Sequence, residues 1–270
     1  MSQESKVTYS KVRCTSALSK SSLPGLDYTV NPYVGCEHAC IYCYVPDVLK
    51  RREFKDQWGG EVYAKENIHE ALTRQVRRLK PGIVGFSTVT DAYQPYEKKL
   101  CLARRTIETL LANRFKISFQ TKSSLILRDQ DLIKGDNVEV GFTITSLDKD
   151  FSRKFEPMAP LPEVRVQGLE TFSERRVKTY IFYGPIIPDY NDDDRTIENI
   201  LNIAKRTHSR VLYDVLRLKP ILSKRLQEKM GIEDYIKIKE SLHREYVEGV
   251  YSKILRTSKQ VGASVEPAFP

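Results

Sequence analysis

The sequence predicts an α/β fold built from one parallel sheet and the helices that connect its strands. Two observations lead to this class. Short β-prone apolar runs alternate with longer segments whose apolar residues recur at helical spacing. Of the 270 residues, 40% are hydrophobic and 29% are charged, which is ordinary for a globular domain with its own core. Alternating strands and helices form either an open doubly wound sheet or a full or partial β/α barrel.

Six strands are expected, with helical segments between most of them. Turn residues and β-prone composition place the strands at 26–30, 83–88, 116–120, 138–145, 177–183 and 211–216. Apolar residues at helical spacing place the main helices at 65–79, 100–111, 125–133, 164–172 and 197–204. Residues 1–25, rich in Ser, Thr and Lys, are expected to form a surface arm, and residues 221–270 a helical extension.

The chain is basic, because 44 Lys and Arg residues outnumber 35 Asp and Glu residues and give a formal net charge of +9. The basic residues form short clusters at 50–52, 77–80, 104–105 and 175–178. This charge permits a polyanionic partner such as nucleic acid, although solvated helix ends and loops give the same pattern. No apolar run approaches the roughly 18 residues of a membrane helix, and the N-terminus lacks the apolar core of a signal peptide. We therefore expect no membrane association and a cytoplasmic location.

Three of the five cysteines share one short stretch directly after the first predicted strand. Cys36, Cys40 and Cys43 are separated by three and then two residues, so a single loop can direct all three sulfur atoms at one inorganic group. In parallel α/β folds, ligands bind at the carboxyl ends of the strands, where this loop is expected to lie. Of the remaining two cysteines, Cys14 is expected to be an unliganded thiol and Cys101 a packed side chain.

The number of cysteines narrows the kind of metal centre. A structural zinc site needs four nitrogen or sulfur ligands, and His38 is the candidate for the fourth, although it would have to fold back within one tight loop. A 4Fe-4S cubane takes four thiolates, so three leave one iron open to a substrate or cofactor. A cluster that only carries electrons, with a further ligand elsewhere, is the other alternative.

The cysteine spacing, with Tyr42 just before the last cysteine, resembles the signature of radical S-adenosylmethionine enzymes. Further stretches are similar to the spore photoproduct lyase-like branch of that superfamily, namely NPYVGCEHACIYCY at 31–44, TDAYQPYE at 90–97, QTK at 120–122 and PIIPDYND at 185–192. The resemblance covers roughly residues 26–220. It implies a partial (β/α)6 TIM-like barrel, which the arm precedes and on which the helical C-terminal extension packs.

The resemblance also implies an activity and its cofactors. Cys36, Cys40 and Cys43 would hold a 4Fe-4S cluster, and S-adenosylmethionine would chelate the open iron through its amino and carboxylate groups. An electron from the reduced cluster would then cleave a carbon–sulfur bond of the cofactor, and the resulting 5′-deoxyadenosyl radical would abstract hydrogen from a substrate. A reductant such as flavodoxin or ferredoxin is the implied partner, and we expect a monomer.

On the cofactor side, the resemblance assigns Tyr42 to the adenine, Asp91 to the amino group and Lys122 to the carboxylate. Thr143 and Thr145 are further candidates for lining the same cavity. A cation and an acceptor at strand ends suit the two charged groups of the cofactor. The alternative interpretation is structural, because an Asp at a strand end often caps the next helix and a Lys usually faces solvent.

On the substrate side, the candidates are Tyr44, Arg153 and Glu156. Arg153 and Glu156 match a family segment after the fourth strand, where a charged pair would contact substrate, and a surface salt bridge is the other interpretation. The lyase itself uses a further cysteine after its second strand as hydrogen donor, whereas residues 83–91 contain none and Cys101 is poorly placed for that role.

Repair of spore photoproduct is therefore not expected. The sequence predicts a radical S-adenosylmethionine enzyme whose substrate is unassigned, with nucleic acid left open. The alternatives are a nucleic-acid-binding protein with a structural metal site and an iron–sulfur electron carrier that does not cleave the cofactor.

Overall fold

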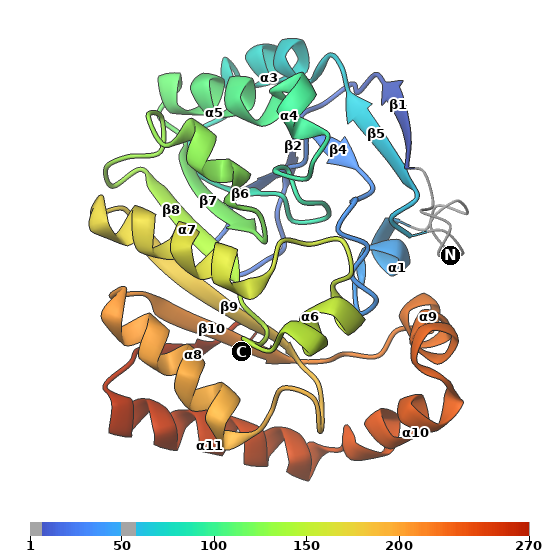
Figure 1. The fold of residues 1–270 in the computed structure, drawn as a ribbon. Coiled ribbons are helices and arrows are strands. Elements are labelled where there is room, and N and C mark those ends of the chain that lie inside the picture. The colour runs from blue at the N-terminus through green and yellow to red at the C-terminus, as the bar shows by residue number, and fades with distance from the viewer. Residues whose placement is uncertain (1–6, 50–57, 270) are drawn as a thin grey trace.

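The main sheet of the protein carries the predicted strands. The computed structural model describes residues 7–49 and 58–269, so the basic cluster at 50–52 lies outside the described residues. The strands of this sheet are, in chain order, β2 (Leu18–Lys20), β3 (Tyr28–Val30), β6 (Ile83–Phe86), β7 (Lys116–Thr121), β8 (Val138–Thr143), β9 (Lys178–Ile186), β10 (Arg210–Val215) and β11 (Val265–Pro267). Their spatial order is β11-β10-β9-β8-β7-β6-β3-β2, which Figure 1 shows as a curved sheet with helices outside it.

The strand order decides between the two architectures that the pattern left open. From β3 through β6, β7, β8 and β9 to β10, each strand pairs in parallel with the next one along the chain. A doubly wound sheet reverses its strand order at a switch point, whereas these six strands wind in one direction as a barrel does. The predicted partial (β/α)6 barrel is confirmed, and β2 and β11 extend its two edges.

Most helices connect the strands as predicted. They are α3 (Ile68–Val76), α4 (Glu97–Leu100), α5 (Leu102–Ala112), α6 (Lys149–Phe155), α7 (Pro162–Glu174) and α8 (Asp194–Arg206). The helix expected at 125–133 is wrong, because the chain forms there only a short 3₁₀ helix, η1 (Ser124–Asp129). Ser123 caps η1 by accepting a hydrogen bond from the Leu125 amide, and the buried carboxylate of Asp129 at its end is held by two arginines.

A second sheet was not predicted. It contains β1 (Thr8–Val12), β5 (Glu61–Lys65) and β4 (Tyr33–Val34), in that spatial order. Strand β1 therefore lies in the segment expected to be a surface arm, and its pairing with β5 joins parts of the chain that are far apart in sequence. Because β4 leads directly into the cysteines, this small sheet fixes the start of their loop.

The C-terminal region consists of α9 (Pro220–Met230), α10 (Ile232–Ser241) and α11 (Arg244–Val261). Figure 1 shows α11 beside α8 and α9 below α1 (Val45–Leu49), and an ion pair between Lys154 and Asp234 joins α6 to α10. The buried apolar side chains form two hydrophobic clusters. The larger one fills the space between the barrel sheet and its helices, and the smaller one surrounds the cysteine loop. Within the described ranges, no helix combines the length and apolar character needed to cross a membrane.

Candidate functional site

The cysteine loop, residues 35–44, runs from the end of β4 to the start of α1. Cys36 and Cys40 are 8% and 6% exposed, Cys43 is partly buried, and all three thiols are free. The loop is braced from several sides, since the Ile41 amide donates to the Phe155 carbonyl at 2.9 Å and the Glu37 amide to the Gln94 side chain at 2.9 Å. The sequence thus places three sulfur atoms on one buried and well-anchored loop.

The donor set fits an iron–sulfur cluster better than a single metal ion. Burial raises the pKa of all three thiols, to about 12 for Cys40, so thiolates here require a bound positive group such as iron. Across the described residues, no three His, Cys, Asp or Glu side chains converge as the ligands of one ion. The thiolates of a cubane bind different irons and therefore stand further apart than the ligands of one zinc ion.

His38 lies in the same loop and is 2% exposed. Its Nδ1 is 3.4 Å from Oδ2 of Asp91, while its Nε2 is buried and has no hydrogen-bond partner among the described residues. Burial lowers the pKa of His38, so the imidazole is neutral. Because a buried ring nitrogen without a partner is costly, His38 is suited to face a group bound at this loop rather than solvent.

Asp91 ties the loop after β6 to the end of β7. Its carboxylate accepts hydrogen bonds from the Thr121 hydroxyl at 2.8 and 3.0 Å, from the Lys122 amide at 2.9 Å and from the Tyr93 amide at 2.9 Å. These contacts and the approach of His38 occupy both oxygens. Asp91 therefore lies where the resemblance expects it, next to Lys122, but in this structure its contacts are those of an anchor.

Tyr42, Thr145 and Lys122 converge on Glu156, which is 1% exposed. Its carboxylate accepts hydrogen bonds from the hydroxyls of Tyr42 and of Thr145, the latter at 2.9 Å, and Lys122 Nζ lies 4.0 Å away. Lys122 also lies 5.4 Å from the centre of the Tyr42 ring. The structure thus brings together four predicted residues that come from four separate parts of the chain.

The sequence did not identify the cation that holds Glu156. Arg165 on α7 is completely buried, forms an ion pair with Glu156 and donates to the Thr143 carbonyl at 3.1 Å. Burial alone would raise the pKa of Glu156, but the charges of Arg165 and Lys122 lower it to about 2. Glu156 is therefore an ionised carboxylate inside the barrel.

Three other candidates, Arg153, Tyr44 and Thr143, contact other groups. Arg153 does not pair with Glu156: its side chain is 67% exposed and pairs with Asp150 at 3.1 Å on the surface of α6, which is the surface salt bridge that the sequence left open. Arg153 lies within α6 on its solvent side. Glu156 is the residue that follows the last turn of the same helix, and its side chain points inward. Tyr44 is 43% exposed and donates to the Thr88 carbonyl at 2.8 Å. Thr143 is buried, and the Gln120 side chain donates to its hydroxyl at 3.4 Å.

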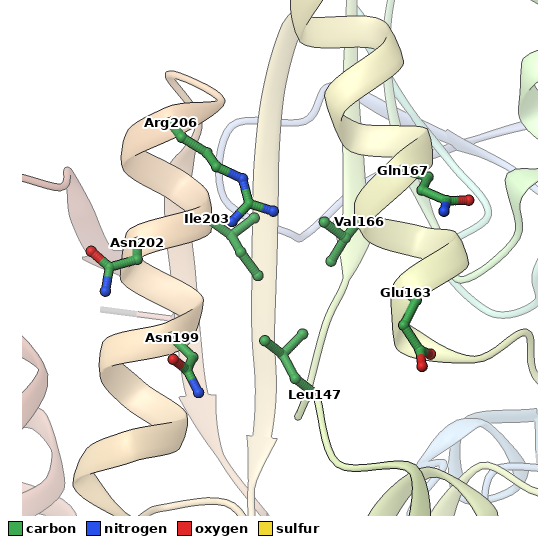
Figure 2. A pocket seen from close by; sticks show the side chains of 8 residues that line it. All are labelled: Leu147, Glu163, Val166, Gln167, Asn199, Asn202, Ile203 and Arg206. Carbon is green, nitrogen blue, oxygen red and sulfur yellow. The ribbon is translucent and has the colours of Figure 1, made fainter.

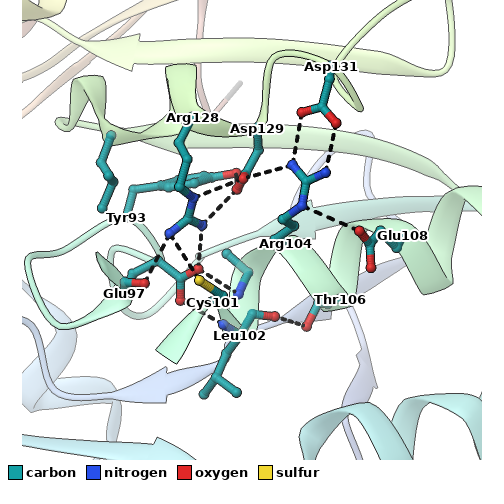
Figure 3. Close-up of polar contacts among 12 residues, drawn as sticks. Tyr93, Glu97, Cys101, Leu102, Arg104, Thr106, Glu108, Arg128, Asp129 and Asp131 are labelled. Carbon is teal, nitrogen blue, oxygen red and sulfur yellow. Dashed lines mark hydrogen bonds and ion pairs between the residues drawn. The ribbon is translucent and has the colours of Figure 1, made fainter. Parts of the chain in front are cut away.

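Cys101 belongs to a different polar network, drawn in Figure 3. It joins α4 to α5, and its sulfur lies 3.6 Å from Nη1 of Arg128. The centre of this network is the buried Glu97, which accepts from Tyr33 at 2.5 Å, from Arg128 at 2.7 Å and from the Leu102 amide at 3.0 Å. Glu97 thereby caps α5 and holds β4, the strand that leads into the cysteine loop. Cys101 therefore packs within a network that stabilises the fold.

A groove of about 360 Å³ lies between α7 and α8, as Figure 2 shows. Leu147, Val166 and Ile203 form its apolar floor. The charged residues on its rim already have partners, since Glu163 pairs with Lys149 and Arg206 with Glu170, each at 2.7 Å. The groove contains none of the predicted site residues and is separate from the cysteine loop.

Comparison with known proteins agrees with the geometry of the cysteine loop. Residues 30–205 match the Radical SAM superfamily, named for S-adenosylmethionine. An uncharacterized protein of Methanocaldococcus jannaschii is 34% identical over 216 residues, which cover 80% of each chain. An uncharacterized protein of Mycobacterium tuberculosis is 28% identical over 207 residues, which cover 72% of this chain and 61% of the relative.

Solved structures show the same fold. A spore photoproduct lyase complexed with dinucleoside spore photoproduct has a TM-score of 0.74 at 15% identity, covering 98% of this chain and 83% of that one. A variant of the lyase with bound AdoMet and the same dinucleoside has a TM-score of 0.72, also at 15% identity, covering 96% of this chain and 81% of that one. The chain therefore belongs to the radical SAM superfamily of enzymes, and its barrel has the fold of spore photoproduct lyase.

Proposed function

We propose that the protein holds a 4Fe-4S cluster on Cys36, Cys40 and Cys43 and binds S-adenosylmethionine at the iron that no thiolate occupies. When bound, these groups supply a 5′-deoxyadenosyl radical that abstracts hydrogen from a substrate. The observation that carries the proposal is the buried loop of three free thiols at the carboxyl ends of the barrel strands, with a polar cluster directly beside it. An external one-electron donor such as flavodoxin or ferredoxin is part of the proposal.

The residues around Glu156 would bind and orient the cofactor. Lys122 offers a cation to the carboxylate of the cofactor. Its position is set by the hydrogen bond that its backbone amide donates to Asp91 and by the Tyr42 ring beside its ammonium group. The Tyr42 ring is buried beside Lys122, and its hydroxyl is fixed by Glu156. Buried side chains such as Tyr42 and Glu156 exclude water, and the exclusion of water protects a reactive intermediate from side reactions.

The test is cofactor cleavage by the reconstituted protein. Anaerobically loaded protein is expected to bind about four irons per chain and, with dithionite and S-adenosylmethionine, to release 5′-deoxyadenosine. A loaded cluster that gives no such product would reject the enzymatic proposal and leave electron transfer. Protein that retains zinc after aerobic purification and takes up no iron would favour a structural metal site.

For the substrate, we infer nucleic acid from the rim of the same barrel face. Two exposed aromatic rings there lie beside cations, since Lys219 Nζ is 5.7 Å from the centre of the Tyr44 ring and the guanidinium carbon of Arg217 is 5.2 Å from that of Phe269. Tyr44 is 43% and Phe269 40% exposed. Aromatic faces stack on bases and neighbouring cations contact phosphates, which a net charge of +9 also favours.

Replacing Lys219 with alanine is expected to weaken binding of single-stranded oligonucleotides and to lower the slope of log K against log salt by about 0.7. Tyr44→Ala should weaken binding by about 1–3 kcal/mol with little change in that slope, since stacking is not electrostatic. Fluorescence anisotropy across a salt series measures both. The control is Lys116→Ala, which removes the same charge at the opposite end of the barrel, where β7 begins. If Lys116→Ala weakened binding as much as Lys219→Ala, binding would depend on the overall positive charge and not on a site at this rim.

A further inference from the structure

Arg225 on α9 reaches back to the cysteine loop across most of the chain. Its side chain is buried, at 6% exposure. Its Nε donates to the Ile41 carbonyl at 2.8 Å, and its Nη2 donates to the Cys43 carbonyl. Two of the three guanidinium nitrogens thus hold the backbone of the loop that carries the thiols.

The position of Arg225 is fixed by the start of its helix. The Asp47 carboxylate on α1 accepts hydrogen bonds from the amides of Ile221 and Leu222 at 2.9 and 3.0 Å. Leu222 and Leu226, at 1% and 0% exposure, pack in the hydrophobic cluster that contains Ile41. Helix α9 is therefore anchored on both sides of Arg225, and its side chain has little freedom to turn away.

The third nitrogen, Nη1, is buried and contacts no hydrogen-bond acceptor among the described residues. Over the same residues, Arg225 forms no salt bridge with an acidic side chain, although a guanidinium stays charged even when buried. A buried cation is stable only when a negative charge or acceptor compensates the lost hydration. Its backbone contacts satisfy the other two nitrogens but supply no negative charge, and the nearby Asp47 carboxylate is already bonded to the amides of Ile221 and Leu222.

We propose that Arg225 is the counter-charge of the cluster, with Nη1 donating to a sulfur of the cluster or of its thiolates, and that it thereby sets the reduction potential. This rests on the cluster of the proposed function. Reduction adds one electron to an already anionic group, so a neighbouring positive charge and an N–H···S bond favour the reduced form and raise the potential. Arg225 is a positioning residue, since it acts through the cluster and its loop.

The test is a redox titration of Arg225→Met, followed by the electron paramagnetic resonance signal of the reduced cluster without S-adenosylmethionine. At a fixed potential, the ratio of reduced to oxidised cluster is expected to fall about tenfold, which is a shift of about 59 mV to more negative values for a one-electron couple. Lys229→Met is the matched control, because it removes a charge from an exposed position on the same helix and should leave the ratio unchanged.

An iron-loaded Arg225→Met whose ratio equals that of the unsubstituted protein would overturn the proposal. If that variant does not hold iron, Arg225→Gln takes its place with the same expected shift, since an amide can still bind the loop carbonyls. Loss of iron from Arg225→Gln but not from Arg225→Lys would support the need for charge, and loss from Arg225→Lys as well would reject it. Failure of the unsubstituted protein to form a cluster would instead contradict the proposed function.

Discussion

Replacing Cys36 with alanine is expected to abolish both the iron–sulfur signal and the release of 5′-deoxyadenosine. The same result is expected for Cys40 and Cys43, because each thiolate binds its own iron and two cannot hold a cubane. The loss of activity should exceed the roughly 100-fold loss that follows when a hydrogen-bond partner of a metal ligand is changed. Iron content, the visible absorption of the reconstituted protein and product analysis measure the effect.

The matched controls are the two cysteines outside the loop. Cys14→Ala and Cys101→Ala change the same functional group, and both variants should keep about four irons and full cofactor cleavage. Cys101 lies in the network around Glu97, and Cys14 packs beside α3 with its amide bonded to Asn67. A cluster that survives in Cys36→Ala but is lost in Cys14→Ala or Cys101→Ala would show that the ligands have been wrongly assigned.

The second large effect is expected from Arg165→Met, which should lower the free energy of unfolding by about 3–5 kcal/mol. The substitution leaves the Glu156 carboxylate buried, and within residues 7–49 and 58–269 the only cation that still pairs with it is the more distant Lys122. Met replaces the long aliphatic part of the side chain, so the cost comes mainly from the unpaired charge. Urea unfolding of the metal-free protein measures the change.

Two further variants separate charge from packing in this pair. The double variant Glu156→Gln with Arg165→Met should recover part of the loss, because no full charge then remains unpaired. Arg153→Met is the surface control and should change stability by less than about 1 kcal/mol, since Arg153 and Asp150 are both exposed. Equal losses for Arg153→Met and Arg165→Met would contradict the contrast between a surface pair and a buried pair.

This contrast also shows what could be predicted from the sequence. The strands and most helices of the barrel follow from local periodicity, and the three cysteines share one short stretch, so both were recognisable. Arg165 was not recognisable as a site residue. An arginine within an amphipathic helix gives the same local pattern whether its side chain faces solvent or pairs with a buried carboxylate. Arg153 stands closer to Glu156 in sequence, yet the end of α6 separates their directions.

Long-range pairing accounts for the other differences. The polar sequence of β1 gives no signal of its own, and it becomes a strand because β5 lies beside it. Arg225 sits among the charged residues of the C-terminal helices, where no short motif links it to a loop near the other end of the chain. The positions of such residues depend on packing between distant segments, which local patterns do not contain.

The contact between Arg225 and Cys43 spans 182 residues of chain. At synthesis rates of roughly 5–20 residues per second, the cysteine loop is made about 10–40 s before α9. During that interval the newly made loop lacks the helix that covers it, and its thiols are open to oxidants and to metal donors. The site is therefore complete only after α9 has been synthesised and Arg225 has bound the carbonyls of Ile41 and Cys43.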